Sequence, residues 1–128
     1  MQRVAVIDYG SSNLRSVEKA IEHVADDQTK VIVTADASVI NEADRVVFPG
    51  QGAIGDCMRN LEEKGLDQVI KSTMQDKPFF GICLGLQSLM AWSDEDGGVE
   101  GLGLIPGKVV RFAKAPSDPI TGERLKIP

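Results

Sequence analysis

The fold is decided by residues 77–90, KPFFGICLGLQSLM. An apolar run, Pro78 to Ile82, predicts a buried β-strand, and an apolar helix is expected to follow from about Leu84 to Trp92. A strand that is apolar on both faces is typical of a parallel sheet covered on both sides. At the junction GICLG, glycines two positions before and after Cys83 allow strand and helix to approach closely. The junction therefore predicts a nucleophile elbow, a sharp turn that presents one reactive side chain.

The rest of the chain alternates short strands with amphipathic helices. Strands are predicted at Val4–Ile7, Val31–Val33, Arg45–Phe48 and Lys108–Phe112. Four helical patterns carry apolar residues at helical spacing: Leu14, Val17, Ile21 and Val24; Val39 and Ile40, after a cap at Asp36; Ile54, Met58 and Leu61; and Leu66, Val69, Ile70 and Met74. This alternation predicts an α/β fold with a doubly wound, mainly parallel sheet and helices on both faces.

The C-terminal third offers fewer elements. Ser93–Gly101 is acidic and rich in glycine, so we expect an exposed loop there, and Ala113–Pro128 contains no pattern that predicts a helix or strand. A doubly wound domain normally has more strands than this chain supplies. We therefore expect residues 1–128 to be the N-terminal part of a single domain whose sheet is incomplete at its C-terminus.

Composition excludes several classes of protein. The 128 residues suffice for one core, and the net charge of −5 is spread over interspersed acidic and basic residues, which argues against nucleic acid as a partner. The longest mainly apolar stretch, Phe79–Leu86, is far shorter than the roughly 20 residues of a membrane span, so a cytoplasmic location is the default expectation. Cys57 and Cys83 belong to no CxxC or Cys/His cluster, so neither a metal nor another cofactor is predicted.

The elbow predicts a reactive thiol at Cys83. A helix N-terminus carries partial positive charge, which favours the thiolate, and the backbone N–H of Leu84 is placed to stabilise an oxyanion. Pro49–Gly52 ends a neighbouring parallel strand and supplies a candidate second donor. Gln87 lies one helical turn beyond the thiol, where it can hydrogen-bond a substrate. The alternatives are a tight junction with a buried thiol, a turn that merely uses glycine, and a solvated surface glutamine.

Four stretches resemble one known family. They are IDYGSSNLRSV (7–17), PGQGAIGDCMRNL (49–61), KPFFGICLGLQSLM (77–90) and GLGLIPGKVVRF (101–112). GICLGLQ by itself resembles class I glutamine amidotransferases in general. Together, the four stretches look like the glutaminase subunits of imidazole glycerol phosphate synthases, which serve histidine biosynthesis, and the resemblance covers almost the whole chain.

The resemblance implies roles for individual residues. Cys83 would form a glutamyl thioester, releasing ammonia and then glutamate from L-glutamine. Oxyanion donors would be Leu84, Gln51 and Gly52, and substrate contacts would be Gln87, Glu95 and Gly50. The ammonia would pass to a (β/α)8 cyclase subunit in a heterodimer, toward which Tyr9, Asn13 and Arg59 would lie.

The main departure from the family is the absence of its catalytic histidine and glutamate, which come from a segment beyond residue 128. His23, the only histidine, falls opposite the apolar stripe of the first helix and is expected at the surface. The chain alone is therefore predicted to be nearly inactive. Cys57 is expected to be a buried core residue.

Three alternatives remain open at this point. The chain is an amidotransferase subunit of another synthase, a catalytically inactive docking module, or a receiver-like or flavodoxin-like binding domain. The last of these leaves the combination of Cys83, Gln87 and Pro49–Gly52 unexplained.

Overall fold

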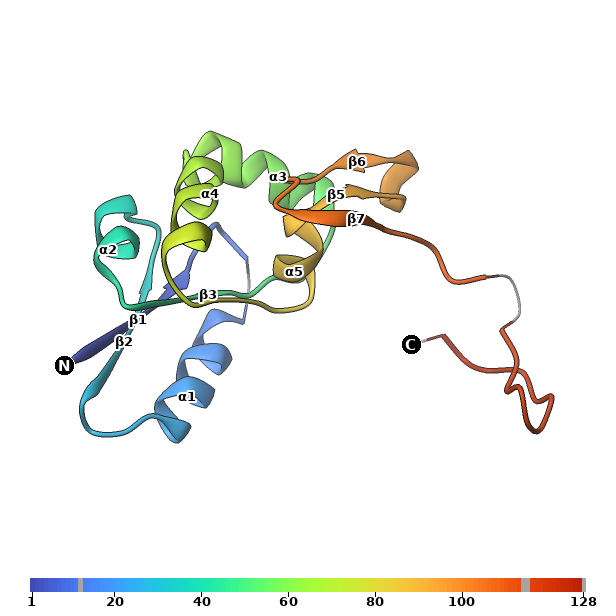
Figure 1. Cartoon of the computed structure of the whole chain (residues 1–128), viewed down its shortest axis with the longest axis horizontal. Coiled ribbons are helices and arrows are strands. Elements are labelled where there is room, and N and C mark those ends of the chain that lie inside the picture. The colour runs from blue at the N-terminus through green and yellow to red at the C-terminus, as the bar shows by residue number, and fades with distance from the viewer. Residues whose placement is uncertain (12, 114–115, 128) are drawn as a thin grey trace.

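The computed structural model describes residues 1–11, 13–113 and 116–127. Its elements follow one another as β1 (Gln2–Ile7), α1 (Leu14–Val24), β2 (Thr29–Thr34), α2 (Ala37–Glu42), β3 (Arg45–Phe48), α3 (Ile54–Glu63), α4 (Leu66–Asp76), β4 (Phe79–Gly81), α5 (Leu84–Leu89), β5 (Met90–Ser93), the 3-10 turn η1 (Glu95–Gly97), β6 (Val99–Glu100) and β7 (Ile105–Val109). They form a four-stranded and a three-stranded sheet. Figure 1 shows the two sheets side by side, with the α-helices around the larger one.

The larger sheet is parallel, with strand order β2-β1-β3-β4. Successive residues of β1 point to opposite faces: Ala5 and Ile7 pack in the core under α2 to α5, whereas Val4 and Val6 pack with apolar residues of α1. In Figure 1, α1 lies on one side of the sheet, and α2, α3 and α4 lie on the other. The predicted doubly wound α/β sheet with helices on both faces is confirmed.

The topology also decides where a ligand site can lie. β2 is on one side of β1 and β3 is on the other, so the direction of winding reverses between β1 and β3. In such sheets, ligands bind beyond the carboxyl ends of the strands at this reversal. The loops that begin at Asp8 and Pro49 leave from these two strand ends, and the turn at Cys83 leaves the end of the neighbouring β4.

Two expectations about buried faces are wrong in detail. Val24, predicted in the buried stripe of α1, is 82% exposed because it is the last helical residue and the chain turns away at Ala25. The strand predicted at Pro78–Ile82 is shorter in the structure, and Phe80 is 63% exposed on it. β4 is an edge strand of this sheet, and α1 on that face packs with Val4, Val6 and Val47 of the inner strands.

The predicted helix from Leu84 to Trp92 ends at Leu89, and Met90–Ser93 is strand β5 instead. The carbonyls that would continue the helix are bonded to residues much later in the chain. Amides of the segment 101–104 donate to them: Gly101 to Ala91 at 3.0 Å, Leu102 to Ser88 at 2.8 Å, Gly103 to Met90 at 3.1 Å and Leu104 to Leu89 at 2.9 Å. A Cβ on Gly101 would lie 2.0 Å from the Met90 oxygen, so only glycine permits this approach.

The smaller sheet has the order β6-β5-β7 and corrects two further expectations. The segment Ser93–Gly101, expected to be an exposed loop, begins with a fully buried Ser93 and contains η1 and β6. The last strand is Ile105–Val109, three residues earlier than the predicted Lys108–Phe112, because its register is set by pairing with β5.

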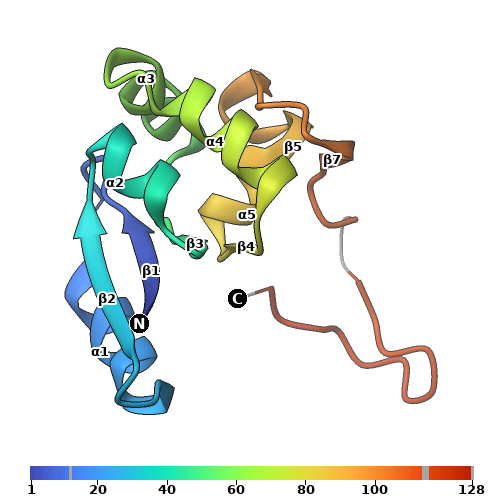
Figure 2. The same cartoon turned by 60° about the vertical axis from the view of Figure 1, so that its left-hand side comes forward.

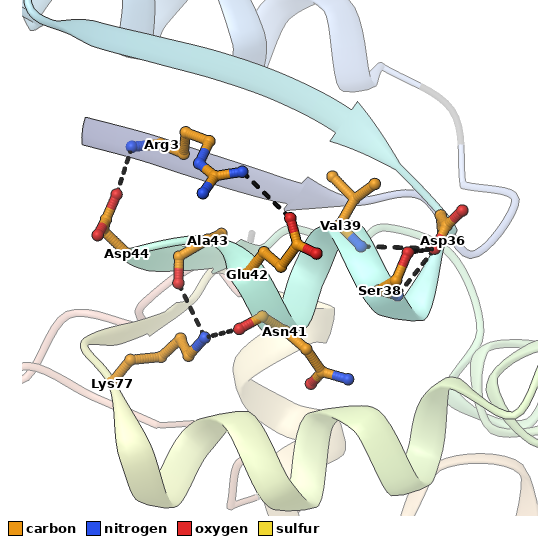
Figure 3. Close-up of polar contacts among 9 residues, drawn as sticks. All are labelled: Arg3, Asp36, Ser38, Val39, Asn41, Glu42, Ala43, Asp44 and Lys77. Carbon is orange, nitrogen blue, oxygen red and sulfur yellow. Dashed lines mark hydrogen bonds and ion pairs between the residues drawn. The ribbon is translucent and has the colours of Figure 1, made fainter. Parts of the chain in front are cut away.

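Polar contacts join α2 to its neighbours (Figure 3). Asp36 accepts hydrogen bonds from Ser38 and Val39 at the start of α2, and these bonds, with Ser38 the largest contributor, lower the pKa of the Asp36 carboxyl. At the other end of α2, Lys77 Nζ donates to the carbonyls of Asn41 at 2.6 Å and Ala43 at 2.8 Å. Asp44 then accepts from the Arg3 amide at 2.7 Å. The cap predicted at Asp36 is confirmed.

Residues 116–127 lie apart from the two sheets in Figure 1, and in Figure 2 they form an open loop at the lower right. The described part of the C-terminal segment, Ala113 and residues 116–127, contains no helix or strand, only an isolated bridge between Ser117 and Arg124. Residues 114, 115 and 128, over which the same prediction extends, lie outside the described residues. Nowhere in the described ranges is there a helix long and apolar enough to cross a membrane.

Candidate active site

Cys83 occupies the turn between β4 and α5, and its side chain is exposed. Its backbone has φ 53° and ψ −117°, a positive φ that L residues rarely adopt. Such a conformation costs on the order of 1–3 kcal/mol, so surrounding structure must enforce it. A strained, exposed cysteine between a strand and a helix has the geometry of a nucleophile elbow. The possibility of a tight junction around a buried thiol is thereby excluded.

The glycines around Cys83 allow the turn to pack against β3. A Cβ on Gly85 would lie 1.9 Å from the carbonyl oxygen of Phe48, and a Cβ on Gly81 would lie 3.0 Å from the Leu86 backbone. Phe48 also accepts the amide of Ile82 at 2.9 Å. The end of β3 and the elbow are thus held in direct backbone contact, as the glycine spacing predicts.

The two predicted oxyanion elements meet at Leu84. Its backbone N–H donates to the carbonyl of Gly50 at 3.3 Å, and a Cβ on Gly50 would lie 3.0 Å from the Gly85 nitrogen. Gln51 and Gly52 follow on the exposed side of this loop. The loop and the elbow are therefore adjacent, but in this conformation the Leu84 amide is occupied by a protein carbonyl. An oxyanion would have to replace the Gly50 oxygen at that amide.

A pocket of about 600 Å³ begins one helical turn beyond the elbow. Gln87, Glu95 and Arg111 line it together with Ser93, Asp94, Asp96, Gly97, Val109 and Val110. Cys83 is not among the lining residues. Its carbonyl accepts a hydrogen bond from the Gln87 amide at 3.0 Å, so Cys83 lies one helical turn before a residue that lines the pocket. The structure thus brings the predicted pair Gln87 and Glu95 together, and it adds Arg111, which the sequence analysis missed.

The segments that build this site match a known family. The family model for glutamine amidotransferase class-I matches residues 5–116, which contain the elbow, the Gly50 loop and all the residues that line the pocket. The chain belongs to the class-I glutamine amidotransferase family. The resemblance inferred from the four sequence stretches is confirmed at this level, and the receiver-like alternative is excluded.

Relatives within the family share a common name. The chain is 55% identical over 128 residues to imidazole glycerol phosphate synthase subunit HisH of Pseudomonas putida, and 56% identical to the subunit of the same name in Aromatoleum aromaticum. Both alignments cover 100% of this chain, but 58% and 59% of those relatives. The chain therefore spans less than two thirds of the length of the curated relatives it matches.

Two solved structures have a similar fold. A crystal structure assigned to a peptidase E protein of Listeria monocytogenes EGD-e superposes with a TM-score of 0.63 at 16% identity, covering 81% of this chain and 63% of that one. A structure assigned to a GMP synthase protein of Thermoplasma acidophilum gives 0.52 at 24% identity, covering 68% and 42%. At these identities the likeness concerns the fold alone.

A second group of polar side chains lies beneath the elbow of this class-I amidotransferase domain. The buried thiol of Cys57 and the hydroxyl of Ser88 are 3.3 Å apart, and Ser88 donates to the Leu84 carbonyl at 2.7 Å. The Ser88 proton is thereby used, so the Cys57 thiol is the donor to Ser88. Burial, the largest cause, raises the pKa of Cys57. Its predicted place in the core is confirmed, since it is 1% exposed.

Tyr9, which the resemblance placed toward a partner, is a core residue. It is 2% exposed, and its ring packs edge-on against Phe48 with centroids 5.6 Å apart. Its side chain is therefore not presented at a surface. The neighbouring loop residue Asn13 is exposed and accepts a hydrogen bond from Ser16 at 2.6 Å, and Arg59 is exposed on α3, paired with Asp56.

The described residues contain no group of three or more His, Cys, Asp or Glu side chains that could hold a metal ion. His23 is exposed on α1, as predicted, and α1 lies across the sheet from the helices that pack beside the elbow. The absence of a histidine beside Cys83 agrees with the count of one histidine in the whole chain.

Proposed function

We propose that the chain carries the nucleophilic half of a glutaminase site, in which Cys83 attacks the side-chain amide of L-glutamine. The observation that carries the proposal is the exposed thiol, held at positive φ beside the Gly50 loop and one turn before the pocket of Gln87 and Glu95. The 52–56% identity to HisH subunits supports the same reaction.

The reaction follows from attack at a carbonyl. Cys83 Sγ bonds to the amide carbon and the carbonyl electrons move to its oxygen, which the Leu84 amide and the segment of Gln51 and Gly52 would stabilise. When the carbonyl re-forms, the C–N bond breaks, and the nitrogen leaves as ammonia after gaining a proton. Water then attacks the thioester carbon, releasing glutamate and restoring the thiol.

The pocket supports recognition of the amino-acid end of glutamine. Glu95 offers a carboxylate for the substrate ammonium group, Gln87 offers both a donor and an acceptor, and Arg111 offers a guanidinium for the carboxylate. Gly50, predicted to contact substrate, lies deeper, against Leu84 and Gly85. An L-α-amino acid with an extended side chain is the class of ligand that such a mixed-charge pocket fits.

The partner is proposed from the relatives' names and from exposed residues. We place a (β/α)8 cyclase subunit of imidazole glycerol phosphate synthase, in a cytoplasmic heterodimer that serves histidine biosynthesis, against the face that carries Asn13 and Arg59. A Cβ on Gly10 would lie 3.7 Å from Asn60 Nδ2, so the loop before Asn13 and the α3 segment of Arg59 are neighbours. Pull-down of a purified cyclase by the chain, weakened by Arg59→Ala, tests this arrangement.

The chemistry is tested with an activated ester, because nitrophenolate leaves without a proton and no histidine is required. The 4-nitrophenyl γ-ester of L-glutamate should release one nitrophenolate per chain and leave a glutamyl adduct on Cys83, identified by peptide mass spectrometry. Cys83→Ala should show no adduct, and Gln87→Ala should lose the preference for the L over the D ester. An adduct at another residue, or equal labelling of the parent chain and Cys83→Ala, would disprove the proposal.

Glutamine itself is expected to turn over poorly. Without a histidine beside the thiol, no residue is available to deprotonate Cys83 or to protonate the leaving nitrogen. Catalytic triads lose most of their rate when one of the three residues is missing. Glutamate release by the isolated chain should therefore be close to that of Cys83→Ala. Release well above that control would contradict this expectation.

A further inference from the structure

Within that proposed function, we propose that the Tyr9 hydroxyl is a positioning residue for the Gly50–Gln51 peptide, and that it takes over the Gly50 carbonyl when this carbonyl leaves the Leu84 amide. The proposal rests on the role of the Leu84 amide as an oxyanion donor. It concerns a side chain that is not among the residues lining the pocket.

The first observation is an unused hydrogen-bonding group. Tyr9 Oη is buried, and none of the described residues offers it a hydrogen bond of acceptable geometry, although Ser11, Cys57 and the Gln51 backbone lie near it. Buried hydroxyls normally have partners, because an unpartnered one has lost its water without replacement. Tyr9 is held in this situation by its ring, which packs edge-on against Phe48 at the end of β3.

The second observation is where this hydroxyl lies. A Cβ on Gly50 would be 2.4 Å from Tyr9 Oη, so the hydroxyl rests directly against the Gly50 backbone. On its other side, Gly50 gives its carbonyl to the Leu84 amide at 3.3 Å. The Gly50 peptide therefore lies between two donors. The Leu84 N–H is bonded to the Gly50 carbonyl, whereas Tyr9 Oη has no acceptor among the described residues.

The chemistry of the site connects these observations. An oxyanion can bind to the Leu84 amide only when the Gly50 carbonyl turns away, and the carbonyl then needs another donor. Tyr9 Oη is adjacent and has no acceptor among the described residues, so the turned carbonyl finds a hydroxyl donor there. Burial also raises the pKa of Tyr9, which keeps the phenol protonated and able to donate at neutral pH.

Two reactions at Cys83 separate positioning from a general structural effect. Acylation by 4-nitrophenyl acetate passes through an oxyanion, whereas alkylation by iodoacetamide is a displacement at a saturated carbon and forms none. In Tyr9→Phe, acylation should slow by about fivefold to tenfold, as expected for one lost hydrogen bond. Alkylation should stay within about twofold of the parent chain, since it needs the same thiol but no oxyanion donor.

Controls keep the outcomes distinct. Thr73→Val removes another buried hydroxyl, on α4 and bonded to the Val69 carbonyl at 2.7 Å, and should alter neither rate. Cys83→Ala gives the background of both reactions. If the parent chain is not acylated at Cys83, the proposed function itself fails. If it is, and Tyr9→Phe reacts at the parent rate, only the role of Tyr9 fails.

Stability supplies an independent readout. Removing an unpartnered hydroxyl should leave the thermal midpoint of Tyr9→Phe equal to or above that of the parent chain. Loss of folding, or an equal slowing of acylation and alkylation, would mean that Tyr9 supports the structure as a whole. Either result would overturn the positioning role.

Discussion

Gly85 is the residue at which the elbow packs most closely against the end of β3. Its Cα faces the Phe48 carbonyl so closely that an added Cβ would be 1.9 Å from the oxygen. Gly85→Ala must separate the elbow from β3 and should lower the free energy of unfolding by about 3 kcal/mol in urea denaturation. Gly55→Ala is the matched control on α3: its nearest neighbour is Arg59 Nη1 at 3.6 Å, and it should stabilise by up to about 1 kcal/mol.

If Gly85→Ala and Gly55→Ala shifted the urea midpoint equally, close packing at the elbow would not be the reason for glycine at position 85. Acylation of Gly85→Ala by 4-nitrophenyl acetate should also be lost. The Leu84 amide, the proposed oxyanion donor, would no longer lie beside the Gly50 loop in that variant.

The two thiols should differ sharply in reactivity. Cys83 is exposed, whereas Cys57 is 1% exposed and its thiol is bonded to Ser88. Iodoacetamide at pH 8 should modify Cys83 alone in the native chain and both cysteines in urea, as read by peptide mass spectrometry. Rapid native labelling of Cys57 would show that the core around α3 opens readily.

The sequence indicated the thiol and the neighbours that its motif fixes. Leu84 and Gln87 follow Cys83 at short, defined spacings, so helical geometry alone placed them. Tyr9 was beyond such reasoning, because it follows β1 in a loop, where periodicity does not distinguish an inward from an outward side chain. Arg111 comes near Gln87 only through the pairing of β7 with β5.

Helix α2 depends on a partner from another element. It has six residues, too few to be stable alone, and Lys77 Nζ bonds the carbonyls of Asn41 and Ala43 at its C-terminus (Figure 3). Lys77→Met should therefore lower the free energy of unfolding by about 0.5–1 kcal/mol. Lys126→Met, which removes an exposed lysine from the C-terminal segment, should have no measurable effect.

Chemical denaturation of the two lysine variants checks this expectation at low ionic strength. An equal loss in both would point to net charge as the cause, and no loss in Lys77→Met would mean that water replaces the ammonium group at the end of α2.

Element boundaries were predictable where the chain carries its own signals. Asp36 caps α2, and proline and glycine end β3, as local chemistry requires. The end of α5 was not predictable, because residues 84–92 read as a continuous apolar helix. Amides of residues 101–104 terminate it by binding its last carbonyls, a contact that no local window contains.

Alkaline pH should weaken the whole fold before it ionises the core. Burial raises the pKa of Cys57 above its ordinary value of 9.0, and it also raises that of Tyr9 above 10.0. Between the ordinary and the raised values, the unfolded chain has lost a proton that the folded chain keeps. The contribution of these two groups to the free energy of unfolding is therefore complete below about pH 9 and decreases as the pH rises above it.

Urea unfolding at pH 7, 9.5 and 10.5 measures this dependence. For Cys57 the slope should approach about 1.4 kcal/mol per pH unit at most. In Cys57→Ala, the loss of stability that begins near pH 9 should disappear. The loss that Tyr9 causes above pH 10 should remain. A parent chain equally stable at pH 7 and 10.5 would mean that neither group is buried in solution.

The four-stranded sheet was accessible from sequence because each strand is followed by a helix of recognisable period, which dictates parallel pairing. The three-stranded sheet was not. Its strands are two to five residues long, include Pro106 and Gly107, and pair across an acidic turn, so they carry little strand signal. They contact the end of α5, and Val99 and Ile105 pack against the main core.

The positive φ of Cys83 sets the proposed reactivity of its thiol against the stability of the fold. Glycine at this position relaxes the backbone but removes the sulfur, whereas alanine removes the sulfur and keeps the strain. Cys83→Gly should therefore resist urea better than Cys83→Ala. Selection for heat resistance alone should therefore enrich glycine at residue 83, and the selected variants would lack the proposed nucleophile.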